Sequence, residues 1–198
     1  MDPKTSIADS TVDVFLRELA SAAPTPGGGA AAAVMGAIGA ALVGMVASLT
    51  IGKKSYAQHQ DLSVYLVNES GLLREHLLRL ADEDAAAYSK YRQAAAMPKD
   101  TPDQIQLRKE AMQQALVDST LVPMEIMEVC DKAMSLVAQA TGHTNQNLAS
   151  DLQIAQQALQ TAASAARENI MVNLPNIEDK HGINERLREI EKLRIHIQ

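Results

Sequence analysis

The chain has little of what builds sheets, disulfides or nucleic-acid interfaces. Aromatic side chains make up 3% of its 198 residues, and Cys130 is the single cysteine. One cysteine excludes an internal disulfide, so we expect a cytoplasmic protein, since thiols stay reduced in that compartment. A formal net charge of −6 argues against a nucleic-acid partner, which would need a basic surface. No segment alternates apolar and polar residues, so no strand is predicted.

Signals for export and for metal binding are also missing. Residues 1–4 contain no apolar segment of the kind that a secretory signal needs. The five histidines show no ligand spacing such as His-Glu-x-x-His, so no metal site is predicted. The glycines at 27–29 form neither a phosphate-binding loop nor a dinucleotide fingerprint, because no strand precedes them.

What the chain does have is a series of long helical patterns rich in alanine, leucine and methionine. We therefore predict an all-α fold, a helical bundle in which residues 1–198 form a single domain. The expected helices cover residues 10–23, 30–51, 56–97, 103–120, 124–140, 147–174 and 183–197. Pro123 is expected to kink or separate the fourth and fifth of these, and Gly71 to interrupt the third.

The helix at 30–51 is almost free of polar residues and rich in glycine and alanine. About 20 apolar residues suffice to cross a membrane, so a small membrane anchor is one interpretation. Small residues at Gly36, Gly39 and Gly44 instead favour a buried central helix against which other helices pack closely. We expect this second arrangement, and a symmetric homodimer with no membrane or nucleic-acid partner.

Asp84 is the most informative polar residue of the third helix. It falls on the same helical face as Leu77, Leu80 and Tyr88, a stripe that is otherwise apolar. A partly buried carboxylate has a raised pKa unless it meets a cation, and either state suits proton transfer. The alternative is that Asp84 is a structural acceptor for a tyrosine or serine hydroxyl. The neighbouring Asp82 is predicted to lie on the solvated surface.

Two further clusters have both a structural and a functional interpretation. Lys53 and Lys54 are expected at the end of the helix at 30–51, where lysines commonly complement the helix dipole. The glycines before that helix would let an anion approach its free N–H groups. Asn147, Ser150 and Asp151 are good helix caps, although residues 142–151 hold more polar side chains than one cap needs. Asn169 and Asn173, one turn apart, suit either packing or a polar ligand.

Together these segments resemble the cyclodeaminase/cyclohydrolase family of folate one-carbon enzymes, in order and in rough spacing over nearly the whole chain. The matching blocks are Pro24-Thr25-Pro26-Gly27-Gly28-Gly29, Leu49-Thr50-Ile51-Gly52-Lys53-Lys54, Asp84-Ala85-Ala86-Ala87-Tyr88, Asn147-Leu148-Ala149-Ser150-Asp151 and Asn169-Ile170-Met171-Val172-Asn173. The loop at 142–147 departs from the family in being longer than a simple Gly-Asn-x-Asn pattern.

The resemblance implies an all-α, dimeric enzyme that binds tetrahydrofolate derivatives and needs no metal or other cofactor. The favoured reaction is hydrolysis of 5,10-methenyltetrahydrofolate to 10-formyltetrahydrofolate. The alternative is the cyclodeaminase reaction, in which 5-formiminotetrahydrofolate closes to the methenyl form and releases ammonia. An alternative of another class is a non-catalytic dimer that binds folate.

Carried onto this sequence, the resemblance makes Asp84 the catalytic base. One lysine, preferably Lys53, is expected to assist proton return to the departing nitrogen or to fix the charge of the Asp84 carboxylate. Asp151 and Asn147 are expected to hold the edge of the pterin. The remaining predicted substrate-binding residues are Gly27, Gly28, Gly29, Lys54, Tyr56, Tyr88 and Ser150, with the glycines and Lys54 meeting the glutamate tail.

Overall fold

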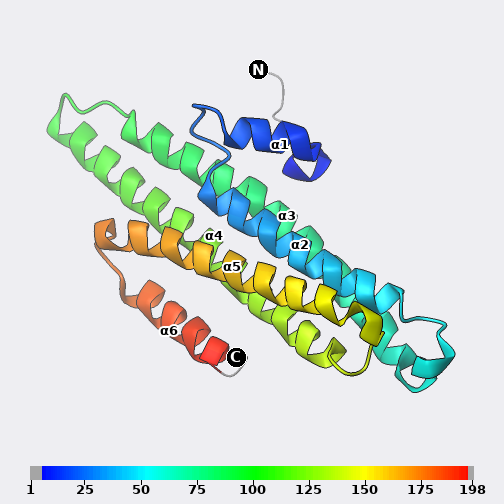
Figure 1. Ribbon diagram of the computed structural model, residues 1–198. Coiled ribbons are helices and arrows are strands. Elements are labelled where there is room, and N and C mark those ends of the chain that lie inside the picture. The colour runs from blue at the N-terminus through cyan, green and yellow to red at the C-terminus, as the bar shows by residue number, and fades with distance from the viewer. Residues whose placement is uncertain (1–5, 196–198) are drawn as a thin grey trace.

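Residues 6–195 of the computed structural model are described, with side chains up to residue 192, and this part of the chain contains helices and no strand. Figure 1 shows its six α-helices, which confirm the predicted all-α fold. They are α1 (Val12–Leu19), α2 (Gly28–Ser48), α3 (Gln60–Ala95), α4 (Pro102–Ala140), α5 (Ala149–Asn173) and α6 (His181–Ile195). The segment at residues 1–4 and the expected end of the last helix at Ile197 lie outside the described residues.

Helix α2 lies at the centre of the bundle and packs against α3, α4 and α5 (Figure 1). Eleven of its 21 residues are buried. A Cβ atom added at Gly36 would lie 3.0 Å from the Sγ of Cys130, and one at Gly39 would lie 2.7 Å from the Cγ of Leu159. A side chain at Gly39 would force the helices to shift, and one at Gly36 would make an unusually tight contact, so glycine permits this close approach. The predicted glycine- and alanine-rich central helix is therefore confirmed.

Helix α2 is also the one described helix that is long and apolar enough to cross a membrane. Length and composition alone are weak grounds for a span, since the core helix of a globular protein has the same properties. Its burial among three other helices accounts for the composition.

Three expectations about helix boundaries were wrong. Pro123 does not separate two helices, because α4 is one helix of 39 residues that runs through this proline, with residues on both sides of it buried against α3 and α5. The free energy gained by burying its apolar neighbours offsets the cost of the hydrogen bond that Pro123 removes. Helix α2 ends at Ser48, and a turn with a positive φ at Gly52 follows it, so Lys53 lies outside the helix in extended backbone. Gly71 does not interrupt α3.

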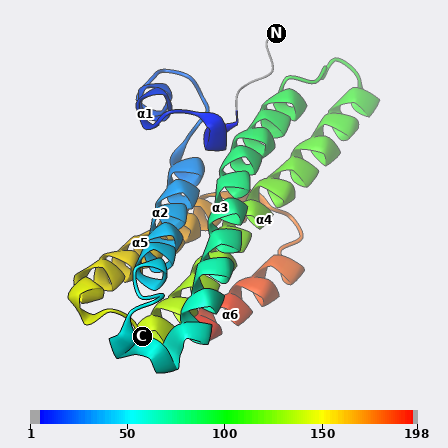
Figure 2. The ribbon, with the colours of Figure 1, turned by 90° about the vertical axis from the view of Figure 1, so that its right-hand side faces the viewer.

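Helices α3 and α4 continue well beyond the point at which α2 begins (Figure 2). A short 3₁₀ helix, Ile7–Asp9, is held against α3 by Asp82, whose carboxylate accepts hydrogen bonds from the Ser6 hydroxyl at 2.6 Å and the Ile7 N–H at 2.9 Å. The prediction that Asp82 is a solvated surface residue was therefore wrong. Its period on the helix could not reveal a partner 75 residues away.

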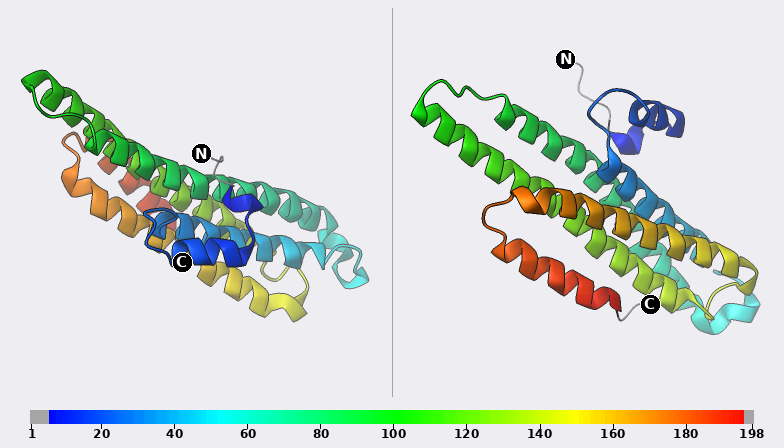
Figure 3. Two further views of the ribbon diagram at one scale, coloured as in Figure 1. Left: turned by 90° about the horizontal axis from the view of Figure 1, so that it is seen from above. Right: turned by 60° about the vertical axis from the view of Figure 1, so that its left-hand side comes forward.

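Helix α6 packs on α4 on the other side of the bundle from α1 (Figure 3). Arg186 of α6 donates two hydrogen bonds to the Glu128 carboxylate, at 2.8 and 3.0 Å. Ile183, Leu187 and Ile190 are buried beneath the helix.

Candidate functional site

A cleft of about 460 Å³ lies where α2 begins. It exists because α2 starts partway along the bundle, while α3, α4 and α5 continue past its first turn. Its lining residues come from the loop before α2, from the first turn of α2, and from α3, α4 and α5. The lining residues are Pro24, Thr25, Gly27, Gly28, Gly29, Asp84, Tyr88, Tyr91, Leu116, Ser119, Asn169, Val172, Asn173 and Asn176.

Asp84 lies directly over the N-terminus of α2. Its Oδ2 accepts a hydrogen bond from the Ala30 N–H at 3.0 Å, in the first turn of that helix. Helix α2 has no side-chain cap of its own, since Gly27 occupies the capping position. Asp84 therefore supplies from α3 the carboxylate that usually comes from the capping residue. A Cβ atom at Gly29 would overlap this carboxylate, with Oδ2 only 2.7 Å away.

Burial raises the pKa of the Asp84 carboxyl above its ordinary value of 3.8, and the hydrogen bond from Ala30 partly opposes the shift. Burial disfavours the charged form of an acid, whereas a donor at a helix N-terminus favours it. The result is a carboxylate that is a better proton acceptor than a solvated aspartate. Such a group at the base of a cleft has the properties of a general base.

The walls of the cleft carry aromatic and amide side chains. Tyr88 and Tyr91 project from α3, and the Tyr88 side chain is 40% exposed. Asn169 and Asn173 face the cleft from α5, one turn apart. Tyr91 and the asparagines were not among the predicted site residues, although the one-turn spacing of Asn169 and Asn173 is visible in the sequence. It could not show that they share a cleft with Asp84.

Asn173 contacts the part of α4 in which Pro123 removes a backbone hydrogen bond. Proline has no N–H, so the carbonyl of Ser119, four residues earlier, lacks its usual partner in the helix. Asn173 donates long hydrogen bonds to this carbonyl at 3.5 Å and to the Ser119 hydroxyl at 3.4 Å. The proline in α4 therefore helps to fix an amide at the cleft.

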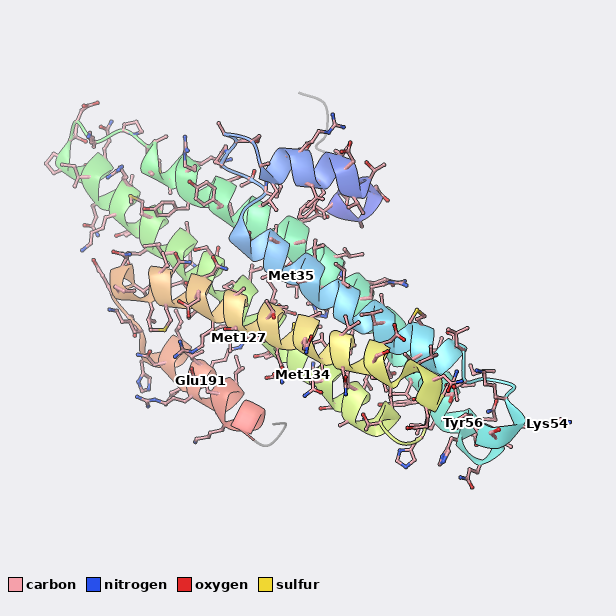
Figure 4. The ribbon with its side chains drawn as sticks, viewed as in Figure 1. Met35, Lys54, Tyr56, Met127, Met134 and Glu191 are labelled. Carbon is pink, nitrogen blue, oxygen red and sulfur yellow. The ribbon has the colours of Figure 1, made fainter. Side chains whose placement is uncertain are left out.

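The other predicted residues lie at the opposite end of α2, about 30 Å away at 1.5 Å per residue. Figure 4 shows Lys54 and Tyr56 there, on the turn that follows the helix. Lys53 and Lys54 are exposed. The Tyr56 hydroxyl accepts a hydrogen bond from the Gln146 N–H at 3.0 Å, which ties this turn to the loop before α5. Tyr56 thus has a structural contact in addition to its predicted role.

The polar cluster before α5 belongs to this second location. Asn147 and Ser150 are exposed, and Asp151 is half-buried in the first turn of α5. None of the three lines the cleft. The structure therefore brings Gly27, Gly28, Gly29, Asp84 and Tyr88 together. It places the other predicted residues at the opposite end of α2: Lys53, Lys54, Tyr56, Asn147, Ser150 and Asp151.

The charge of the cleft follows from this division. Among its described lining residues, Asp84 is the single carboxylic acid, and there is no lysine, arginine or histidine. The cleft offers a base, two aromatic rings and several neutral amides. These groups suit a planar, hydrogen-bonding and partly cationic ring system.

Comparison with known proteins agrees with this arrangement. The family described as formiminotransferase-cyclodeaminase matches residues 11–192. The methenyltetrahydrofolate cyclohydrolase of Methylorubrum extorquens is 39% identical over 186 residues, which cover 93% of this chain and 89% of that protein. The formimidoyltransferase-cyclodeaminase of Rattus norvegicus is 30% identical over 94% of this chain, but only 36% of the rat protein is covered.

A solved structure is similar over nearly the whole chain. The formiminotetrahydrofolate cyclodeaminase of Thermotoga maritima matches with a TM-score of 0.85 and 28% sequence identity. The match covers 96% of this chain and 91% of the Thermotoga chain. The helical arrangement described above is thus that of the cyclodeaminase fold.

Proposed function

The chain belongs to the formiminotransferase-cyclodeaminase family, and we propose that it hydrolyses 5,10-methenyltetrahydrofolate to 10-formyltetrahydrofolate. The observation that carries the proposal is the position of Asp84, a carboxylate of raised pKa set over the N-terminus of α2 in a cleft of about 460 Å³. The similarity to a methenyltetrahydrofolate cyclohydrolase over almost the full length of both proteins supports it.

The reaction adds water to the carbon that bridges N5 and N10 of the folate. That bridge is an amidinium-like cation, so the carbon is already electrophilic. The Asp84 carboxylate accepts a proton from the attacking water, and the water oxygen bonds to the bridge carbon. The bond from this carbon to N5 then breaks as N5 gains the proton that Asp84 accepted. The hydroxyl group on the carbon loses its remaining proton to solvent, so the carbon stays on N10 as a formyl group. A positioned base contributes about 10²–10⁴-fold to such a step.

The cleft also suggests how the pterin is held. Asn169 and Asn173 are the side-chain amides that share the cleft with Asp84. Each carries donors and an acceptor, as the pterin edge does. The exposed ring of Tyr88 offers a surface for stacking. Neither Asn147 nor Asp151 lines the cleft of its own chain. Their expected contact with the edge of the pterin therefore stays a prediction.

The cyclodeaminase reaction is the second candidate, favoured by the likeness to the Thermotoga cyclodeaminase structure. In that reaction N10 attacks the formimino carbon on N5 and ammonia leaves. Asp84 would then take the N10 proton, so the same base serves both reactions. A non-catalytic folate-binding dimer would not need a carboxylate of raised pKa.

The deciding experiment measures turnover of 5,10-methenyltetrahydrofolate from its near-ultraviolet absorbance, against the spontaneous rate in buffer. A parallel reaction with 5-formiminotetrahydrofolate follows ammonia release. Accelerated loss of the methenyl absorbance alone supports the cyclohydrolase. Ammonia release with accumulation of the methenyl compound identifies the cyclodeaminase. No acceleration of either reaction would contradict an enzymatic role and leave the binding dimer.

The proposal includes a cytoplasmic homodimer that works without a metal or other cofactor. The chain has one cysteine, Cys130, which cannot form an internal disulfide, and proteins of a reducing compartment typically lack disulfides. Chelator treatment of the purified protein is expected to leave turnover unchanged.

A further inference from the structure

The segment between α5 and α6, residues 174–180, contributes one residue to the cleft and is held by α4 from outside it. Figure 1 shows this connector leaving the end of α5 and turning back to α6. It begins as a short 3₁₀ helix, Leu174–Asn176, and becomes extended at Ile177. Asn176 is the connector residue that lines the cleft together with Asp84. The course of the connector therefore decides where the Asn176 side chain lies.

Gln113 of α4 binds the connector on both sides of Ile177. Its side-chain NH₂ group donates a hydrogen bond to the Asn176 carbonyl at 3.0 Å, and its side-chain oxygen accepts one from the Glu178 N–H at 2.9 Å. Both bonds have the ordinary length of an N–H···O bond. The two partners also fix the orientation of the amide, since one is an acceptor and the other a donor. One side chain thus attaches backbone groups that lie 63 and 65 positions away in the sequence.

The core holds the connector as well, but only through its apolar side chains. Ile177 is buried, and Leu174 packs against the same hydrophobic cluster. A buried side chain anchors its residue without setting the orientation of the peptide groups beside it. Gln113 sets that orientation, and the carbonyl that it binds belongs to Asn176, the residue at the cleft.

The connector has room to move away from the cleft. A second cavity of about 330 Å³ is bordered by α4 and the connector, and Gln113, Ile177 and Glu178 are among its lining residues. Asn176 lines the cleft and not this cavity, so the connector separates the two spaces. The Lys109–Glu178 ion pair at 3.0 Å is exposed to solvent, and such pairs contribute little. The two bonds of Gln113 are therefore what keeps the connector from shifting into the second cavity.

We propose that Gln113 is a positioning residue for folate binding, which holds Asn176 at the cleft without itself touching the substrate. The proposal rests on the proposed function, because the ligand that the Asn176 amide meets is the polar edge of the pterin. Asp84 projects from α3, and its bond to Ala30 does not involve the connector. Loss of the Gln113 bonds therefore weakens substrate binding and leaves the proton-transfer step unchanged.

The kinetics of Gln113→Leu test this. Leucine keeps an apolar side chain at this position, but it can neither donate to Asn176 nor accept from Glu178. We expect the KM for 5,10-methenyltetrahydrofolate to rise about tenfold, while kcat changes by less than about threefold. An unchanged KM, or a fall in kcat as large as the rise in KM, would overturn the proposal.

The matched control is Gln114→Leu, at the next residue of α4. The Gln114 side chain is exposed and donates to Asp118 of the same helix at 2.8 Å, so it is directed away from the connector. Its KM and kcat are expected to stay within about twofold of wild type, as for most surface substitutions. An equal rise in KM for the two variants would show that the effect is not specific to Gln113.

A double-mutant cycle distinguishes positioning from a general weakening of the fold. If Gln113 acts through the Asn176 side chain, Asn176→Ala raises KM by itself. Adding Gln113→Leu to Asn176→Ala then has little further effect, because the positioned group is already gone. Effects on KM that multiply instead would show two independent contributions and would overturn the proposal.

A second variant and a measurement without turnover complete the test. Gln113→Glu keeps the length of the side chain and an acceptor for Glu178, but at neutral pH it cannot donate to the Asn176 carbonyl. We expect calorimetry to show binding of tetrahydrofolate weakened by about tenfold. Hydrogen exchange is expected to be faster in residues 174–180 and unchanged in α2 and α3. Wild-type affinity in this variant would contradict the positioning role.

These outcomes are distinct from failure of the proposed function. If wild-type protein accelerates neither folate reaction and does not bind tetrahydrofolate, the function is wrong. If wild-type protein is active and both Gln113 variants bind and turn over substrate as wild type does, the function stands and the positioning role is wrong.

Discussion

Asp84 has a structural contact and a proposed chemical role, and one substitution separates them. In Asp84→Asn the side-chain oxygen still accepts from the Ala30 N–H, so α2 keeps its cap. We expect the free energy of unfolding, measured in urea, to stay within about 1 kcal/mol of wild type. The asparagine amide cannot accept a proton from water near neutral pH, so turnover of the methenyl compound is expected to fall by about 10²–10⁴-fold.

The control for this prediction is Asp151→Asn, at the far end of α2. If Asp84→Asn turned over substrate at nearly the wild-type rate while Asp151→Asn was inactive, the roles assigned to the two carboxylates would be reversed. Asp84→Ala is the second control, since it removes the cap as well. It is expected to lose about 0.5–2 kcal/mol of stability in addition to activity.

The pH dependence of activity reports the same carboxylate. Because burial raises the pKa of Asp84 above 3.8, its basic form is populated only at higher pH than for a solvated aspartate. The acid limb of the kcat/KM profile is therefore expected above pH 3.8 and to be absent in Asp84→Asn. Each rate is measured against the spontaneous hydrolysis in the same buffer. An acid limb that the substitution leaves unchanged would exclude Asp84 as its source.

The pH dependence of stability has the opposite sign. The folded protein holds the Asp84 proton more tightly than the unfolded chain does, so folding is favoured where Asp84 is protonated in both states. This contribution is present below pH 3.8 and is lost as the pH rises through the raised pKa. Urea unfolding of wild type and Asp84→Asn across this range should show wild type losing stability relative to the variant.

At the residue scale, the sequence predicted the position of Asp84 but not its partner. A carboxylate on an apolar helical face indicates burial, and burial is what raises its pKa. The contact with Ala30 joins residues 54 positions apart and follows only from how α2 and α3 pack. The same reason explains why Asp82 was misjudged and why Asn169 and Asn173 were left undecided.

At the scale of elements, the start of α2 is the junction most sensitive to one added methyl group. In Gly29→Ala the new Cβ would overlap the Asp84 carboxylate, so α2 or Asp84 must move. We expect a loss of about 1–3 kcal/mol of unfolding free energy, as for other overpacked sites, together with reduced turnover.

Gly28→Ala is the matched control for that prediction. A Cβ atom at Gly28 meets nothing within 4 Å, and the residue is exposed in the same helical turn. Replacing glycine by alanine in a helix usually stabilises by about 0.5–1 kcal/mol. If both variants lost stability equally, the tight contact between Gly29 and Asp84 would not be what constrains this turn.

Helix type was easier to predict than helix ends. Long 3.6-residue periodicity predicted each helix of the bundle, and proline and glycine were taken as the boundaries. Pro98 does follow the end of α3, whereas Pro123 lies inside α4. Proline ends a helix where the backbone is exposed and can leave the helical conformation at little cost. It stays inside a helix where packing on both sides holds the backbone, as at the buried Pro123.

At the scale of the whole molecule, the predicted site residues fall into two groups that the sequence could not separate. Residues 27–29 and 53–56 flank the same helix, but the length of that helix keeps them about 30 Å apart. Proximity in sequence suggested one site. Because of the helical geometry, residues of both groups can share one site only where two chains contribute to it. The assignment of residues 1–198 to one domain stays a prediction.

A homodimer whose subunits meet through the exposed, apolar outer face of α2, which includes Ile38 and Met45, would have a stability that depends on protein concentration. A homodimer is stabilised by mass action, so Tm should rise as concentration rises, whereas the Tm of a monomer does not. Ile38→Glu places a charge on the outer face of α2 and should remove this dependence, yield monomers in sedimentation and reduce turnover, although Ile38 does not line the cleft.

The control is Leu107→Glu on α4, where the original side chain is 57% exposed against 53% for Ile38. It should leave Tm, mass and turnover as in wild type, because nothing links that surface to the cleft or to α2. A dimer that survives Ile38→Glu with full activity would show that the subunits meet elsewhere.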